Sequence, residues 1–233
     1  MASVTAGMDP ALEVPTCPGW TAAKLVKHTG IVHRWVERIV ATRTSARIEQ
    51  RDIETGLPAA EAGYPAWLAA GAAPLTATLR SAGPDAAVWA WGADQRSGWW
   101  ARRMLHETTV HRADADLARG GWPEIDPVVA ADGIDEFLSN LPTARRASAR
   151  LAELPAGASL HLHATDSDGE WLIRFDGGAV KWSRGHEKAT TAVRGPATEL
   201  LLFTYGRIPG QDSRLSVFGD QSLPGVWQEK TAL

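Results

Sequence analysis

The chain of 233 residues has little that would suit a secreted, membrane-spanning or nucleic-acid-binding protein. Its one cysteine, Cys17, cannot form an internal disulfide, so we expect a cytoplasmic protein. No apolar run approaches the roughly 18 residues of a membrane span. The first stretch, MASVTAGMDPALEVP, lacks the basic start and apolar core of a secretory signal. A net charge of −3 argues against nucleic-acid partners, which require concentrated Lys and Arg.

What the sequence does contain is two parts with different patterns. Apolar residues recur at helical spacing within residues 17–43, 64–83, 98–119 and 127–141, which predicts a bundle of four helices. Thr21 is the expected N-cap of the first, and Pro74 is expected to kink or break the second. After residue 159, short alternating segments separated by Asp-Gly and Gly-Gly turns predict strands, with helices at 196–207 and 222–230.

We therefore expect an α+β protein of two domains, a helical one at 1–145 and one with a mostly antiparallel sheet at 155–233. The segment PTARRASARLAELPAGAS between them is small, polar and basic, and it predicts a connector with a short helical stretch.

Helical phase selects three side chains that could bind a metal together. Glu107 and His111 are four residues apart, so their side chains meet on one face of their helix, and that face is otherwise apolar. In the first helix, His28 lies inside the apolar stripe and His33 lies at its margin. His106 is five residues from His111 and is expected to flank the site.

Two interpretations of these three side chains remain open on phase alone. A buried carboxylate needs a partner, and a Glu–His hydrogen bond between two helices would supply one for Glu107. Two imidazoles and a carboxylate also suit zinc or a similar divalent ion, with one position left for water or substrate. Asp114 falls near the same stripe and could orient His111, or it could be a solvated residue that balances Arg112.

The stretches VPTCPGWTAAKLVKHTGIVHRWV and RRMLHETTVHRADAD resemble the mycothiol-dependent maleylpyruvate isomerase family, and GPATELLLFTYGR and LSVFGD extend the resemblance into the second part. The resemblance implies a DinB-like four-helix bundle with His28, Glu107 and His111 as metal ligands. It also implies a C-terminal α+β domain related to sterol-carrier-like folds. The implied cofactors are Zn²⁺, or a similar divalent metal, and mycothiol. The mycothiol thiolate would add to the cis double bond of a maleylpyruvate-type substrate and leave after rotation about the resulting single bond.

The function that we expect from the resemblance is that of a monomeric zinc-dependent enzyme acting on a small molecule with mycothiol. Isomerisation and transfer of mycothiol to an electrophile both fit. A metal-dependent hydrolase and a non-catalytic, metal-stabilised ligand-binding protein are the alternatives. Arg194 and Arg207 are the candidate catalytic residues, as cationic partners of an anionic substrate, and Arg102 or Arg103 could also bind a carboxylate.

The remaining histidines and the cysteine receive structural interpretations. Cys17 is interpreted as a packed residue before the first helix, because mycothiol would bring the sulfur. His161 and His163 alternate on one strand face, and no carboxylate or cysteine accompanies them in the sequence, so we interpret this face as exposed. His186 is interpreted as a turn residue.

Overall fold

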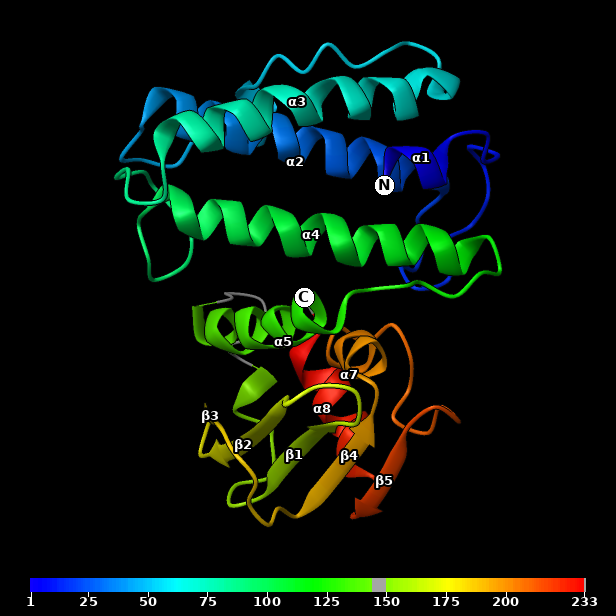
Figure 1. Ribbon diagram of the computed structural model, residues 1–233, viewed down its shortest axis with the longest axis vertical. Coiled ribbons are helices and arrows are strands. Elements are labelled where there is room, and N and C mark those ends of the chain that lie inside the picture. The colour runs from blue at the N-terminus through cyan, green and yellow to red at the C-terminus, as the bar shows by residue number, and fades with distance from the viewer. Residues whose placement is uncertain (144–149, 233) are drawn as a thin grey trace. The chain divides into compact units, whose positions relative to one another are not determined.

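The computed structural model describes residues 1–143 and 150–232, and its contacts divide the chain into two compact units, Met1–Pro123 and Glu124–Leu233. The first unit is helical, and the second combines a five-stranded sheet with helices (Figure 1). This arrangement confirms the predicted α+β fold. None of the helices in the described residues has both the length and the apolarity needed to cross a bilayer.

The first unit consists of a short helix, α1 (Ala2–Thr5), and three long ones, α2 (Ala22–Thr42), α3 (Tyr64–Ala82) and α4 (Ser97–Ala118). Two short 3₁₀ turns, Gln50–Asp52 and Glu61–Gly63, lie between α2 and α3. Figure 1 shows the three long helices lying side by side. The chain continues as a helix through Pro74, so the proline does not break α3.

Helix α2 begins and ends where its local chemistry requires. The hydroxyl oxygen of Thr21 accepts a hydrogen bond from the Lys24 backbone N–H at 3.3 Å, which confirms the predicted N-cap. The helix ends at Thr42, and the next residue, Arg43, is its C-cap, whose left-handed conformation, with φ of 48°, stops the α-helical hydrogen bonding. Between these ends, the buried side of α2 packs against α3 and α4 through Leu25, Val32, Val36 and Ile39, among others.

A cluster of tryptophan rings joins the end of α2 to the start of α4. Trp35, Trp89, Trp99 and Trp100 pack with ring centroids between 4.7 and 6.1 Å apart, mostly edge to face. The indole N–H of Trp100 donates to the Trp89 carbonyl at 2.7 Å. Because such rings bury a large area, the cluster fixes the relative position of the two helices that carry the candidate metal ligands.

The second unit contains a sheet in the order β3-β2-β1-β4-β5. Its strands are β1 (Ser159–Ala164), β2 (Glu170–Asp176), β3 (Ala179–Arg184), β4 (Thr191–Gly195) and β5 (Ser216–Gly219). Three of the four strand pairs are antiparallel, and β1–β4 is parallel, so the predicted mostly antiparallel sheet is confirmed. The helices of this unit are α5 (Pro127–Asn140), α7 (Ala197–Thr204) and α8 (Leu223–Thr231), with a 3₁₀ turn at Leu141–Thr143. Part of the expected connector, residues 144–149, lies outside the described residues.

Helix α5 is grouped with the second unit, whereas its apolar stripe predicted that it would be the fourth helix of the bundle in the first domain. The contacts place the division after Pro123, earlier than the expected boundary. The physical reason is the packing of Phe137, whose ring lies 4.8 Å from Tyr205 and 6.5 Å from Trp227. Asp135 of α5 also accepts hydrogen bonds from Trp171 of β2 and from Arg184 of β3, at 2.7 to 2.8 Å.

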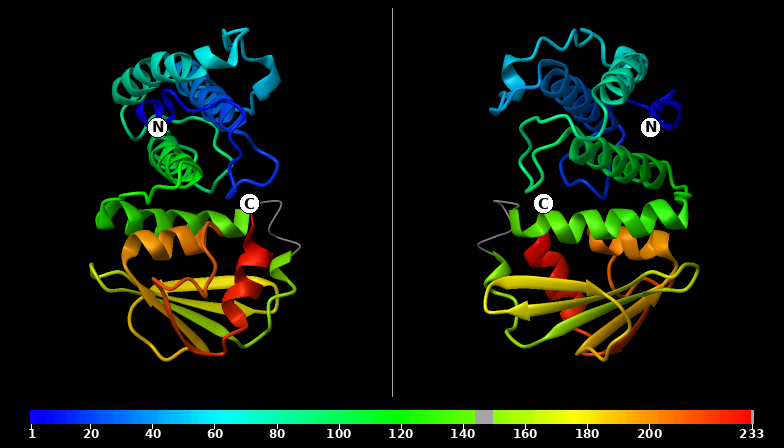
Figure 2. Two further views of the ribbon diagram at one scale, coloured as in Figure 1. Left: turned by 90° about the vertical axis from the view of Figure 1, so that its right-hand side faces the viewer. Right: turned by 60° about the vertical axis from the view of Figure 1, so that its left-hand side comes forward.

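Among the described residues of this unit, the helices cover one face of the sheet and none lies on the other face (Figure 2). On the covered face, Trp171 and Ile173 of β2 are fully buried, and Phe175 stacks on Trp227 of α8 with centroids 5.8 Å apart. Because side chains alternate along a strand, His161 and His163 of β1 point to the opposite face.

A candidate metal centre on helices α2 and α4

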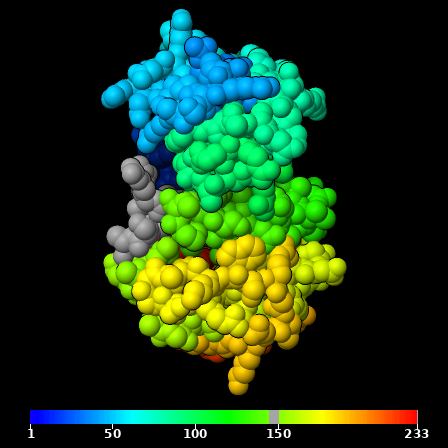
Figure 3. All heavy atoms as spheres, turned by 90° about the vertical axis from the view of Figure 1, so that its left-hand side faces the viewer, coloured from blue at the N-terminus to red at the C-terminus, as the bar shows by residue number. Residues whose placement is uncertain are grey.

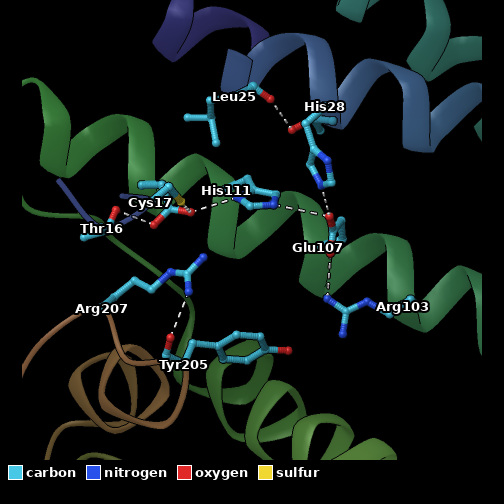
Figure 4. A network of polar contacts seen from close by, with 11 residues as sticks. Thr16, Cys17, Leu25, His28, Arg103, Glu107, His111, Tyr205 and Arg207 are labelled. Atoms are coloured by element: carbon cyan, nitrogen blue, oxygen red, sulfur yellow. Dashed lines mark hydrogen bonds and ion pairs between the residues drawn. The ribbon is translucent and has the colours of Figure 1, made fainter. Parts of the chain in front are cut away.

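Three side chains selected by helical phase come together between α2 and α4. Figure 4 shows His28 of α2 pointing toward Glu107 and His111 of α4. Nε2 of His28 lies 2.9 Å from Oε1 of Glu107, and Nε2 of His111 lies 3.3 Å from the same oxygen. One ligand atom from each residue can be chosen so that all three lie within 4.8 Å of one another.

These separations fit the edges of a tetrahedral metal site. With Zn–N and Zn–O bonds of about 2.0–2.1 Å, tetrahedral geometry places neighbouring ligand atoms about 3.3 Å apart. Two imidazole nitrogens and one carboxylate oxygen are also a donor set that zinc accepts, with one position open. The residues present therefore fit a divalent ion.

Asp114 orients His111 by contacting Nδ1, the ring nitrogen that is not directed toward Glu107. Its Oδ2 lies 2.8 Å from Nδ1 of His111, which leaves Nε2 directed toward Glu107. The carboxylate is 0% exposed and accepts two further hydrogen bonds, from the Thr16 hydroxyl at 2.6 Å and from the Cys17 thiol at 3.3 Å. A carboxylate that holds the second nitrogen of a metal-binding histidine fixes both the tautomer and the ring orientation. The prediction that Asp114 could orient His111 is thus supported by the contact between them.

The loop before α2 places these supporting groups. The backbone N–H of Cys17 donates to the Val14 carbonyl at 2.9 Å, and that of Trp20 donates to the Cys17 carbonyl at 2.9 Å. Gly19, with φ of 78°, permits the left-handed turn. The turn buries Cys17 as the sequence interpretation expected, but also gives its thiol a partner in Asp114.

Charge and hydrogen bonding keep Glu107 ionised. Burial raises the pKa of Glu107, but hydrogen bonds with His111 and His28 outweigh it and hold this pKa well below its ordinary value. Arg103, one turn earlier on α4, lowers it further, with Nη2 at 3.1 Å from Oε2. Burial lowers the pKa of His111, whereas hydrogen bonds with Asp114 and other neighbours raise it well above its ordinary value. Without a metal, the centre is a tightly paired acid–base cluster.

Trp20 forms a wall beside the two imidazoles. Its ring lies 4.9 Å from that of His28 and stacks at 5.9 Å on that of His111. The His28 side chain is 36% exposed, whereas that of His111 is 10% exposed. Access to the ligand atoms is therefore from the His28 side.

The other two histidines of the first unit are buried outside the three-residue set. His33, expected at the margin of the stripe, lies with Nε2 2.8 Å from the Thr108 hydroxyl. The pKa of His33 is lowered to about 4, mainly because the ring is buried. Glu107 raises this pKa, and Arg34 and the N-terminal amine lower it. His106, expected to flank the site, is fully buried.

The arginines predicted from the sequence have different surroundings. Arg103, considered as a carboxylate binder, holds Glu107, a partner that its i, i+4 spacing could have revealed. Arg194 is exposed on β4, opposite His163 of β1 in the parallel pairing. Arg207 is partly buried after α7, with Nη1 donating to the Tyr205 carbonyl at 2.8 Å. Catalytic roles for Arg194 and Arg207 stay predictions.

The interpretation of the sheet histidines as an exposed face is wrong for His161, which is buried. A carboxylate does accompany the histidines: antiparallel pairing places Glu170 of β2 directly opposite His163. His186, expected to be a turn residue, follows β3 and reaches the same carboxylate at 3.0 Å. This arrangement could not be predicted, because the cross-strand register cannot be read from the sequence.

Known protein domains match the chain in both of its units. The mycothiol maleylpyruvate isomerase N-terminal domain matches residues 1–116, and the MDMPI C-terminal domain matches residues 128–225. No curated protein gives a significant match. Among solved structures, a mutant of mycothiol-dependent maleylpyruvate isomerase is 13% identical, with a TM-score of 0.61 over 93% of this chain and 86% of that one.

A UbiJ-SCP2 ubiquinone synthesis protein is 15% identical and covers 45% of this chain and 94% of its own, but its TM-score of 0.36 supports no argument. The two domain matches together span both units and define a two-domain α+β enzyme. The chain belongs to the mycothiol-dependent maleylpyruvate isomerase family.

Proposed function

We propose that this enzyme is a zinc-dependent isomerase that uses mycothiol and acts on a maleylpyruvate-type substrate. The observation that carries the proposal is the convergence of His28, Glu107 and His111, within 4.8 Å of one another, in a chain of this family. A ligand set with an open position suits catalysis better than a purely structural role, for which a fourth protein ligand is usual.

The metal and the thiol would supply the reactive chemistry. His28, Glu107 and His111 would hold a zinc ion, which would lower the pKa of a bound thiol and polarise a carbonyl oxygen. Since mycothiol brings its own sulfur, no cysteine of the chain is needed as a nucleophile. Cys17 fits this division of roles, because it is buried and its thiol is bonded to Asp114.

The residues of the chain hold and shield the ligand atoms. Asp114 keeps the ligating nitrogen of His111 directed at the centre, and Arg103 holds the far oxygen of Glu107. The ring of Trp20 covers one side of both imidazoles and limits the access of water. We propose that substrate and thiol approach past His28, the more exposed ligand.

An unsaturated keto dicarboxylate needs cationic partners, and Arg207 is one of the two candidates. Its guanidinium has several N–H groups, and a planar fork binds a carboxylate in two places. Arg207→Lys should raise KM while leaving kcat within a few-fold, and Arg207→Gln should raise KM further. An unchanged KM in both variants removes Arg207 from the proposal, and the same assay on Arg194→Gln tests the other candidate.

The test of the whole proposal starts from metal content. Zinc should copurify with the wild-type chain, and conversion of maleylpyruvate to the trans isomer should require both zinc and mycothiol. Glu107→Gln should bind one zinc ion per chain fewer than the wild type and should lose the activity. Glu37→Gln is the matched control, since Glu37 lies on α2 and accepts from Thr78 at 3.0 Å, outside the centre.

Two outcomes would refute the proposal. One is full activity after exhaustive chelation, and the other is an unchanged number of zinc ions per chain in Glu107→Gln. Formation of a stable mycothiol adduct in place of the trans isomer would identify a transferase, and thiol-independent hydrolysis would identify a metal hydrolase.

A further inference from the structure

A second cluster of metal-binding side chains lies on the helix-free face of the sheet in the second unit. His161 and His163 come from β1, Glu170 comes from β2, and His186 follows β3. The strand register brings them together, because His163 is paired directly with Glu170. The backbone N–H of Gly185 donates to the Glu170 carbonyl at 3.2 Å, which holds His186 next to the same residue.

All three imidazoles surround one carboxylate. Nδ1 of His163 lies 2.7 Å from Oε1 of Glu170. Nδ1 of His186 lies 3.0 Å from Oε2, and Nε2 of His161 lies 3.8 Å from Oε2. The three rings lie 5.2 to 6.1 Å apart between centroids. Ligand atoms of His161, Glu170 and His186 all lie within 4.8 Å of one another.

The strongest sign of a missing ligand is the buried nitrogen of His161. This residue is 4% exposed, and its Nε2 has no hydrogen-bond partner. A buried polar atom without a partner destabilises the folded state. The unpartnered atom lies 3.8 Å from Oε2 of Glu170, too far for a hydrogen bond, so a small cation between them would give Nε2 of His161 a partner.

We propose that His161, Glu170 and His186 form a second divalent-metal site, specific for zinc or a similar transition-metal ion. Two imidazole nitrogens and a carboxylate oxygen are the donor set, and water completes the coordination. His163 has an orienting role, because it holds Oε1 at 2.7 Å, whereas Oε2 is the oxygen nearer to the other two histidines. Nothing in the proposed isomerase mechanism uses this cluster.

The site is open to solvent on one side. The His186 side chain is 75% exposed and that of Glu170 is 23% exposed, whereas His161 is buried at the back. Figure 3 shows the part of the chain around β2 and β3, in yellow, on the surface of the second unit. An ion can therefore bind from solution without movement of the sheet.

The experiment counts metal ions per chain in the full-length protein. Metal-free protein is titrated with Zn²⁺ in competition with a chromophoric chelator, and with Co²⁺ to follow its absorption. In a Glu107→Gln background, which removes the first centre, one zinc per chain should remain. Adding His186→Ala should weaken this zinc more than about 100-fold, and adding His163→Ala should weaken it about 10–100-fold, as expected for an orienting residue.

The controls separate metal binding from folding. His186 is exposed, so its replacement by alanine should leave the thermal unfolding of the metal-free protein unchanged. Glu187→Gln is the matched control, because Glu187 is an exposed carboxylate paired with Arg174 at 2.6 Å, and it should leave zinc binding unchanged. The proposal is overturned by a Glu107→Gln protein that binds no zinc, or by one whose zinc affinity does not change with His186→Ala.

Discussion

Replacing Asp114 with asparagine tests how the candidate metal centre is oriented. The carboxylate accepts bonds from His111, Thr16 and Cys17 and is fully buried, so no water can take the place of a lost partner. Asparagine has almost the same shape, but it offers one oxygen and an NH₂ group that can only donate. At least one of the donors that face Asp114 must then lose its acceptor, and where that donor is His111, the ring can adopt the wrong tautomer.

The magnitude follows from these contacts. Loss of an orienting partner of a metal-binding histidine typically weakens metal affinity about 10–100-fold, or about 1.4–2.8 kcal/mol. Hydrogen bonds to a charged acceptor contribute about 1.5–3 kcal/mol each, and asparagine retains part of them. We therefore expect Asp114→Asn to destabilise the metal-free chain by roughly 2–4 kcal/mol.

Two measurements separate these effects. Competition with a chromophoric chelator gives the zinc affinity, and urea unfolding of the metal-free protein gives the free energy of unfolding. Asp116→Asn is the matched control, since this carboxylate on the same helix pairs with Arg112 at 3.6 Å and should leave zinc affinity unchanged. Wild-type zinc affinity in a folded Asp114→Asn protein would refute the orienting role.

Three further predictions concern stability. Gly30→Ala should lower the free energy of unfolding by about 1–3 kcal/mol, because a Cβ there would lie 2.1 Å from the Trp67 ring. Gly225→Ala in α8 should raise it by about 0.5–1 kcal/mol, because a Cβ there would meet nothing within 4 Å. Urea unfolding of both variants checks this. The free energy of unfolding should fall by up to about 3 kcal/mol as the pH is lowered from about 6.5 to about 4, because His33 binds a proton in the unfolded chain at a higher pH than in the folded one. The free energy of unfolding of His33→Gln should depend less steeply on pH over this range. Asp135→Ala should cost about 2 kcal/mol by removing three hydrogen bonds between α5 and the sheet, measured as a lower Tm.

The helical part of the site could be predicted because a helix fixes which residues share a face. Glu107 and His111 meet through their i, i+4 spacing, and the apolar stripe of α2 directs His28 inward, so phase alone selected the three side chains that the structure brings together. Asp114 followed from the same reasoning. The loop residues Thr16 and Trp20 did not, because the turn before α2 is formed by backbone bonds that have no periodic signature.

The sheet cluster could not be predicted for a different reason. Strand periodicity correctly placed His161 and His163 on one face, but which residue lies opposite each depends on register. Glu170 is seven residues from His163 along the chain, and only the antiparallel pairing makes them neighbours. The domain boundary differed for a related reason, since the apolar stripe of α5 fits any apolar surface and its packing partner, α7, is distant in the sequence.

The two clusters share a donor set, but their supports differ, and this difference has a measurable consequence. In the first, His111 is 10% exposed and is held by Asp114, which is itself fully buried and bonded to the loop before α2. In the second, His186 is 75% exposed and has no comparable buried support among the contacts described, apart from its bond to Glu170. Ordering an exposed side chain on binding costs conformational entropy, up to about 1.5–2 kcal/mol for the most flexible side chains, whereas a preoriented ligand avoids that cost. A chelator added in steps should therefore remove the ion of the sheet cluster before that of the helical centre. Removal in the reverse order would contradict the assignment of Asp114 as the group that preorganises the helical centre.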